Sequence, residues 1–264
     1  MSVLVVIPAR FASTRYPGKP LVQLRGATGK SRSLIQRSWE AAQQIKSADK
    51  VVVATDDHRI KSAAEGFGAE VVMTSSSCGN GTERCGEAAE LLGQFDVIVN
   101  FQGDAPLTPS WFVDDLVASM NDPEVAVSTP VLRCDAAALN GFKEDRANDR
   151  VGGTTAVFDR AGKAMYFSKE VLPYTGRNFS DTEITPVFHH VGVYAYRLHA
   201  LQRYAQMSEG VLERWEGLEQ LRFMENGVPV QCVEVDAKGR AFWELNNPVD
   251  VERIEKILAD QGMT

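Results

Sequence analysis

The chain has 264 residues, of which 44% are hydrophobic, and its formal net charge is −7. This length and composition suit one large α/β domain, or one domain with a sizeable insertion, and argue against a disordered chain. An acidic chain without a basic stripe is not expected to bind nucleic acid. It has no run of about 18 apolar residues and no signal-peptide pattern, so we predict no membrane span and a cytoplasmic location.

The first half of the chain alternates β-rich runs with helical patterns. Strands are expected at 3–7, 51–54, 70–73 and 96–101, and helices at 34–45, 58–66 and 83–92. The continuous apolar run at 51–53 is typical of a strand that is buried on both faces. This alternation predicts βαβ units and a mostly parallel sheet with helices on both faces.

The pattern changes after about residue 122. Extended runs are expected at 125–132, 154–158, 189–196 and 228–235, a charged loop at 143–150, and helices at 211–225 and 249–258. In the 211–225 helix we expect four apolar side chains to face the core, namely Leu212, Trp215, Leu218 and Leu221. No repeat or linker divides the chain. We therefore predict a single domain over 1–264 with an embedded β-containing subdomain at roughly 123–200.

Three cations, Arg10, Arg15 and Lys19, lie in the loop 8–21 that follows the first predicted strand. In open α/β sheets, ligands bind beyond the carboxyl ends of the strands, which is where this loop must lie. Arginine offers forked donors to phosphate oxygens and lysine a compact charge, while Gly18 lets backbone N–H groups approach. We interpret the loop as a triphosphate site; the alternative is a solvated basic loop.

Asp104 follows another apolar strand, next to Gly103, which permits a sharp turn. Mg²⁺ bound to a nucleotide takes one or two carboxylates, and phosphates and water complete its octahedron. Asp104 suits that role, although an aspartate after a strand is commonly a turn former or helix cap. For Asp56 and Asp57 we favour capping of the helix near His58.

Other familiar motifs are absent. The stretch 26–31 has too few residues between its glycines for a phosphate-binding P-loop, so we expect a surface turn there. No G-x-G-x-x-G follows the first strand, which argues against a dinucleotide oxidoreductase. The histidines and cysteines lack metal-ligand spacing, and the scattered cysteines indicate a reducing compartment.

Six motifs extend along almost the whole chain. They are P-A-R-x-x-S-x-R-x-P-G-K-P-L at 8–21, V-A-T-D-D at 53–57, G-T-E-R at 81–84, Q-G-D-x-P at 102–106, H-x-G-x-Y-x-Y-R at 190–197 and L-E-x-x-E-x-L-E-Q-L-R at 212–222. Together they resemble those of the 3-deoxy-manno-octulosonate (Kdo) cytidylyltransferases.

The resemblance implies a Rossmann-like nucleotidyltransferase fold, a dimerisation subdomain and hence a homodimer, and dependence on Mg²⁺. It implies transfer of CMP from CTP to the anomeric hydroxyl of a 2-keto sugar acid, with Kdo as the best candidate, and release of pyrophosphate. By this resemblance the nucleotide is held by Pro8, Ala9, Arg10, Arg15, Lys19 and Arg84, with Arg10, Lys19 and Asp104 as catalytic residues. The sugar acid is held by Gln102, His190, Tyr194, Glu219 and Gln220, although His190 equally suits a core histidine.

Two departures from the family pattern concern the metal and the acceptor. Asn246 stands where the family usually has a metal-binding aspartate, and Ala105 replaces a glutamate beside Asp104. We expect Asp104 and Asn246 to hold the metal, with weaker affinity than two carboxylates. A different ketosugar acid or a phosphonate remains an alternative acceptor, and an inactive nucleotide-binding protein is the second alternative. A glycosyltransferase is disfavoured because no D-x-D motif occurs at 104–106.

Overall fold

The computed structural model describes residues 1–12, 16–93, 95–151, 153–241, 243–245 and 247–264. Within them, one large mixed sheet has the strand order β5-β4-β1-β6-β11-β7-β10-β8-β9, and β12 pairs with β7. The strands are β1 (Val3–Ala9), β4 (Lys50–Thr55), β5 (Glu70–Met73), β6 (Val97–Phe101), β7 (Val127–Arg133), β8 (Thr154–Phe158), β9 (Ala164–Ser168), β10 (Phe188–His190), β11 (Val193–Tyr196) and β12 (Gln231–Val235). A separate hairpin joins β2 (Gln23–Arg25) to β3 (Ser31–Ser33).

The parallel part of the sheet is made by the N-terminal half of the chain. There β1 pairs in parallel with both β4 and β6, and β5 pairs in parallel with β4. Beyond β6 the strands β11, β7, β10, β8 and β9 pair antiparallel, and β12 returns in parallel to β7. The predicted α/β fold with added β structure is therefore confirmed.

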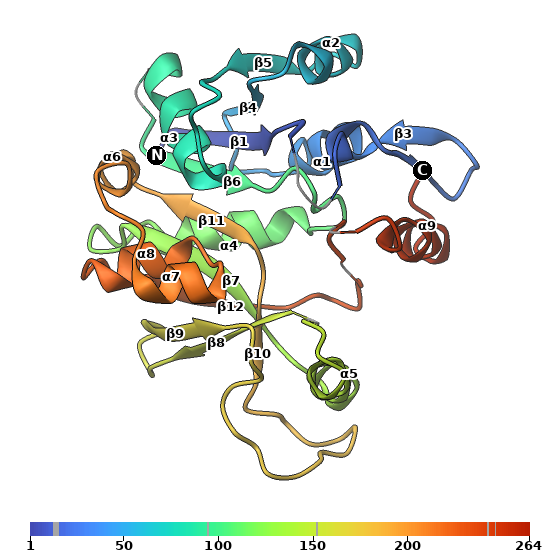
Figure 1. The fold of residues 1–264 in the computed structure, drawn as a ribbon, viewed down its shortest axis with the longest axis vertical. Helices are drawn as coiled ribbons and strands as arrows, with labels where there is room; N and C mark the ends of the chain where they lie inside the picture. The colour runs from blue at the N-terminus through green and yellow to red at the C-terminus, as the bar shows by residue number, and fades with distance from the viewer. Residues whose placement is uncertain (13–15, 94, 152, 242, 246) are drawn as a thin grey trace.

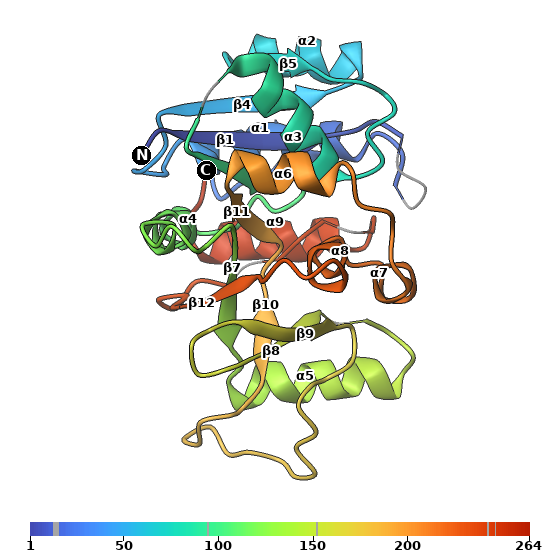
Figure 2. The same ribbon diagram turned by 90° about the vertical axis from the view of Figure 1, so that its left-hand side faces the viewer.

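Helices cover both faces of the sheet (Figures 1 and 2). One face packs against α1 (Leu34–Ala42), α2 (His58–Gly66) and α4 (Ser110–Ser119), and the other against α3 (Gly81–Leu92), α6 (Leu198–Tyr204) and α8 (Gln220–Glu225). Successive residues of β1 enter opposite cores: Val5 lies with the α1 side and Val6 with the α3 side. Such double burial is why this strand is uniformly apolar.

The remaining helices are η1 (Lys19–Leu21), α5 (Ala136–Ala147), α7 (Val211–Glu216) and α9 (Asp250–Asp260). In Figure 1, β8, β9 and α5 lie at the far end of the sheet from β5 and α2. This end falls within the predicted subdomain at 123–200, whose role in dimerisation stays a prediction. No helix in the described ranges is both long enough and apolar enough to cross a membrane.

Three local predictions are wrong. The expected loop at 143–150 instead contains the end of α5, a helix that Asp135 caps by accepting a hydrogen bond from the Ala138 N–H at 2.7 Å. The expected helix 211–225 is broken into α7 and α8, because Gly217 adopts a left-handed conformation with φ of 62°. The segment 189–196 likewise divides between β10 and β11.

The break at Gly217 changes which side chains are buried. Leu212 and Trp215, expected in the core, are 41% and 86% exposed, whereas Leu221 is buried as predicted. The buried positions on this pair of helices include Glu213 and Arg222, which form a salt bridge with each other. A single amphipathic helix would bury apolar side chains at these positions. The two short helices instead contact each other through a buried ion pair.

We predict that Gly217→Ala lowers the free energy of unfolding by about 1 kcal/mol, because alanine disfavours the left-handed conformation that ends α7. Chemical denaturation measures this change. Gly141→Ala is the matched control: Gly141 lies inside α5, and an added Cβ there meets nothing within 4 Å. It should stabilise the protein by up to about 1 kcal/mol. Equal effects from both substitutions would contradict the left-handed conformation assigned to Gly217.

Candidate functional site

A cleft of about 280 Å³ lies beyond the carboxyl ends of β1 and β6. Its wall is built by the loop after β1, the loop after β6, the start of α3 and one residue of the 211–225 region. The lining residues are Pro8, Ala9, Arg10, Lys19, Pro20, Leu34, Gly79, Asn80, Gly81, Arg84, Gln102, Gly103, Asp104 and Glu219. The structure thus brings together most of the candidate residues from four separate motifs.

The loops after β1 and β6 approach each other backbone to backbone. A Cβ added at Gly103 would lie only 2.7 Å from the Pro8 carbonyl oxygen, so glycine is required for this contact. The Ser38 hydroxyl, from α1, donates to the Gly103 carbonyl oxygen at 3.0 Å. The turn that carries Asp104 is therefore fixed against β1 and α1.

Two cations and one carboxylate face the cleft from these loops. Lys19 Nζ lies 2.5 Å from Asp104 Oδ2, and both side chains are partly exposed. Arg10 is exposed and donates to the Gly79 carbonyl oxygen at 3.3 Å. A triphosphate entering here meets an arginine fork and an ammonium group. Arg15 lies outside the described residues.

Arg84 reaches the cleft from α3 and is almost fully buried. Its guanidinium donates to the Thr74 hydroxyl at 2.5 Å and lies 3.5 Å from Asp56 Oδ2. Asp56 therefore pairs with Arg84 and does not cap a helix as we had expected. Asp57 caps α2 as predicted, accepting from the Arg59 N–H at 2.8 Å.

The metal prediction stays a prediction: it names Asp104, which lines the cleft, and Asn246, which lies outside the described part of the chain. Asp104 presents its carboxylate to the cleft, and its carbonyl oxygen accepts from the Leu245 N–H at 2.9 Å. Asn246 is not among the described residues. Within the described ranges no cluster of three or more histidine, cysteine or acidic side chains could hold a metal. One carboxylate fits a magnesium ion whose other ligands are phosphates and water.

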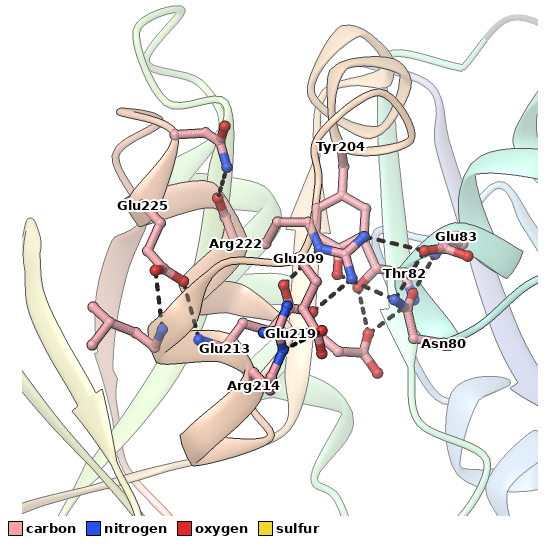
Figure 3. Close-up of polar contacts among 12 residues, drawn as sticks. Asn80, Thr82, Glu83, Tyr204, Glu209, Glu213, Arg214, Glu219, Arg222 and Glu225 are labelled. Atoms are coloured by element: carbon pink, nitrogen blue, oxygen red, sulfur yellow. Dashed lines mark hydrogen bonds and ion pairs between the residues drawn. The ribbon is translucent and has the colours of Figure 1, made fainter.

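Glu219 faces the cleft near the start of α3. Its carboxylate accepts from the Thr82 hydroxyl at 2.7 Å, the Thr82 N–H at 3.1 Å and the Gly81 N–H at 3.4 Å. Burial raises the pKa of Glu219, while these hydrogen bonds oppose the shift. The helix N-terminus thus holds a carboxylate at the wall of the cleft (Figure 3).

Tyr194 and Gln220 lie behind the residues that line the cleft. The Tyr194 hydroxyl donates to Gln220 Oε1 at 2.9 Å, and both side chains are buried. Tyr194 pairs across the sheet with Asn100 of β6. These residues support the wall near Glu219, and their direct contact with a sugar acid stays a prediction.

His190 is deep in the sheet. Its Nε2 lies 2.9 Å from Thr129 Oγ1, and its ring packs edge-on against Phe167 with centroids 4.9 Å apart. Burial lowers the pKa of His190 to about 3 and that of His189 to about 4. The structure therefore gives His190 the surroundings of a core histidine, and its role in substrate binding stays a prediction.

Sequence reasoning missed two groups near the cleft. Gly79 and Asn80 line it, and Asn80 caps α3 by accepting from the Glu83 N–H at 2.8 Å. The signal was present in the turn-forming sequence C-G-N directly before G-T-E-R. Asn100 is fully buried and, among the described residues, neither atom of its side-chain amide has a hydrogen-bond partner. A lone asparagine within the apolar strand V-I-V-N-F was the available signal.

Comparisons with known proteins agree with this geometry. Residues 4–235 match a family described as Cytidylyltransferase. A 3-deoxy-manno-octulosonate cytidylyltransferase of Maricaulis maris (strain MCS10) is 41% identical over 264 residues, covering 99% of both chains. A mitochondrial relative of the same name from Arabidopsis thaliana is 37% identical, covering 99% of this chain and 85% of the relative.

A solved structure of a CMP:2-keto-3-deoxy-manno-octonic acid synthetase complexed with CTP has a similar fold. Its TM-score is 0.82 at 32% sequence identity, and the alignment covers 99% of this chain and all of the other. A putative glucose-1-phosphate thymidylyltransferase from Bacillus anthracis shares the fold more distantly, with a TM-score of 0.60 at 13% identity.

The buried histidines predict a pH dependence of stability. Because the folded-state pKa of His190 is depressed to about 3, the unfolded chain binds the extra proton between that value and about 6.5. Stability should thus be full well above pH 6.5 and decline as the pH falls, by about 3 kcal/mol for this residue at pH 4.5. Denaturation at pH 7 and pH 4.5 measures the loss.

His190→Gln should make that decline smaller, whereas His199→Gln, at an exposed position, should leave it unchanged. If His190→Gln had the same pH dependence as the parent protein, His190 would not be the neutral, buried group that the structure shows.

Proposed function

Because the chain belongs to the family of the 3-deoxy-manno-octulosonate cytidylyltransferases, we propose that it transfers CMP from CTP to Kdo and releases pyrophosphate. The observation that carries this proposal is the meeting of four family motifs at one cleft, where cations and Asp104 face Glu219. The similarity to this family covers nearly the whole chain. The proposal therefore rests on the acceptor-side motifs as well as on the nucleotide-side motifs.

The reaction is an in-line attack of the anomeric hydroxyl oxygen of the acceptor on the α-phosphorus of CTP. The new oxygen–phosphorus bond forms as the bond to pyrophosphate breaks, and the hydroxyl proton is released. Nucleotidyl transfer of this kind depends on positioning and charge neutralisation and needs no protein nucleophile. In this proposal Arg10 and Lys19, which line the cleft, neutralise the leaving pyrophosphate, with Arg15 as a further candidate outside the described residues.

Magnesium dependence is part of the proposal. Asp104 is the described residue that would hold the ion, with Asn246 as the second expected ligand. When bound, Mg²⁺ supplies positive charge to the phosphate oxygens. The same carboxylate pairs with Lys19 at 2.5 Å, so Asp104 would hold the ion, and Lys19 would bind phosphate, only by giving up this ion pair.

In this proposal the acceptor is recognised by Gln102 and Glu219, which both line the cleft, with the Tyr194–Gln220 pair behind them. The Gln102 amide oxygen and the Glu219 carboxylate offer hydrogen-bond acceptors to sugar hydroxyls. A different ketosugar acid or a phosphonate remains the alternative acceptor, since Ala105 and Asn246 depart from the family pattern.

A homodimer and a cytoplasmic location complete the proposal. Exposed apolar side chains within the 123–200 subdomain support a dimer interface there: Met165, Tyr174 and Ile184 are 64%, 91% and 79% exposed. The cytoplasmic location rests on the resemblance and on the cysteines, which are all free thiols in the structure.

Pyrophosphate release with CTP, Mg²⁺ and a panel of acids tests the proposed reaction. Kdo should give the highest kcat/KM, and no pyrophosphate should form without an acceptor. Turnover with a different ketosugar acid or a phosphonate, and none with Kdo, would show that the other acid is the acceptor. Silence with every acceptor while CTP still binds would favour the inactive nucleotide-binding protein.

Lys19→Met should lower kcat at least about 100-fold, because it removes a preorganised charge at the leaving group. The far-UV spectrum should not change, since the side chain is partly exposed. Lys256→Met, on the exposed surface of α9, is the control and should keep parental turnover. An unchanged rate in Lys19→Met would remove Lys19 from the mechanism.

Asp104→Asn should raise the Mg²⁺ concentration needed for half-maximal turnover by about tenfold or more, because the amide lacks the negative charge of a carboxylate. Chelation of divalent ions should stop the reaction in both proteins. Asp115→Asn, exposed on α4, should leave the Mg²⁺ titration unchanged. The assignment fails if the titration curves of Asp104→Asn and the parent protein coincide.

A further inference from the structure

Arg222 is a nearly buried arginine behind the cleft and not among the residues that line it. Its Nε and Nη2 atoms each lie 2.7 Å from a carboxylate oxygen of Glu213, so the pair is bidentate. Its Nη1 atom lies 3.2 Å from Glu83 Oε1, and the guanidinium lies 4.3 Å from the centre of the Tyr204 ring. The hydrogen bonds to Glu213 raise the pKa of Arg222. The group is therefore a fixed cation (Figure 3).

Arg222 joins three short pieces of structure. Glu213 belongs to α7 and Arg222 to α8, which are separated by the left-handed Gly217, while Glu83 belongs to the first turn of α3. Helices of six residues, such as α7 and α8, have little stability of their own. Their positions must come from tertiary contacts, and the Arg222 guanidinium is the group that touches both neighbours.

The attachment of α8 to α3 has two points. Glu219 accepts from the N–H groups of Gly81 and Thr82, and Arg222, three residues later, pairs with Glu83. Glu83 in turn accepts from the Gly79 N–H at 2.7 Å and so also holds the turn that lines the cleft. The Arg222–Glu83 ion pair thus connects α8, which begins directly after Glu219, to the turn at Gly79 that lines the cleft.

We propose that Arg222 is a positioning residue for the acceptor: through Glu83 and Glu213 it sets the place of Glu219 and Gln220 against the start of α3. This inference rests on the proposed transfer to a sugar acid. Arg222 acts through its neighbours and does not touch substrate.

Apart from the hydrogen bond that Arg10 donates to the Gly79 carbonyl oxygen, the nucleotide side of the cleft is held by other contacts. Lys19 pairs with Asp104, and the turn at Gly103 is fixed by Ser38. Arg84 follows Glu83 in α3, but Thr74 and Asp56 hold its guanidinium. Loss of Arg222 should therefore weaken acceptor binding far more than CTP binding.

Steady-state kinetics with each substrate varied in turn tests this separation. Arg222→Met should raise KM for the sugar acid about tenfold or more and change KM for CTP by less than about twofold. Arg222→Lys keeps the positive charge but has a single donor nitrogen, so it should recover part of the loss. Arg214→Met is the matched control, because Arg214 lies on α7, is exposed and pairs only with Glu209 among the described residues. It should behave as the parent protein.

Arg222→Met leaves Glu213 buried without its cation, which itself threatens folding. The double variant Arg222→Met/Glu213→Gln removes that stray charge and should fold more stably. It still lacks the link to Glu83, so its KM for the sugar acid should stay about tenfold high. A return to the parental KM, or equal rises in both KM values, would overturn the proposal.

Amide hydrogen exchange provides a readout that does not depend on the acceptor. In Arg222→Met and in the double variant, exchange at 79–84 and 217–221 should accelerate by about tenfold, with the β1 and β6 amides unchanged. Absence of pyrophosphate release by the parent protein with Kdo would count against the proposed function alone. Unchanged exchange in these two segments would count against the role of Arg222, whichever acid is used.

Discussion

The site depends on the parallel pairing of β1 with β6. Val6 lies opposite Asn100 in this pairing, so the loops that leave both strands begin at one edge of the sheet. Gly103 then allows the second loop to contact the carbonyl of Pro8, where any Cβ would clash. Arg10, Lys19 and Asp104 meet because the sheet register and one missing side chain bring their loops together.

The wall of the cleft that we propose binds the nucleotide and the wall that we propose binds the acceptor are stabilised by different interactions. The nucleotide wall consists of loops fixed by backbone packing, and its charges are partly exposed and available to phosphate. The acceptor wall is carried by short helices whose places are set by buried ion pairs and by a carboxylate at a helix N-terminus. Under the proposed function, nucleotide binding and acceptor binding would therefore depend on separate sets of contacts.

Much of the fold followed from the sequence, because doubly buried strands and amphipathic helices leave strong patterns in the N-terminal half. The meeting of the cation loop and Asp104 at one cleft was also predicted, since both follow strands of the parallel sheet, while their roles in binding stay predictions. The break at Gly217 was missed because the spacing of Leu212, Trp215 and Leu218 is also typical of one continuous amphipathic helix. The burial of Glu213 and Arg222 could not be read from sequence, since charged residues are normally exposed and only tertiary contact reveals their pairing. His190 stayed ambiguous for the related reason that a buried histidine and a binding histidine look alike in a strand.

A crystal structure with CTP and Mg²⁺ tests the central claim most directly. The account predicts that the triphosphate lies between the loops 8–21 and 102–106, with Lys19 turned from Asp104 to phosphate and the metal on Asp104. A nucleotide bound elsewhere, or one bound in the cleft with the Lys19–Asp104 ion pair intact, would contradict it.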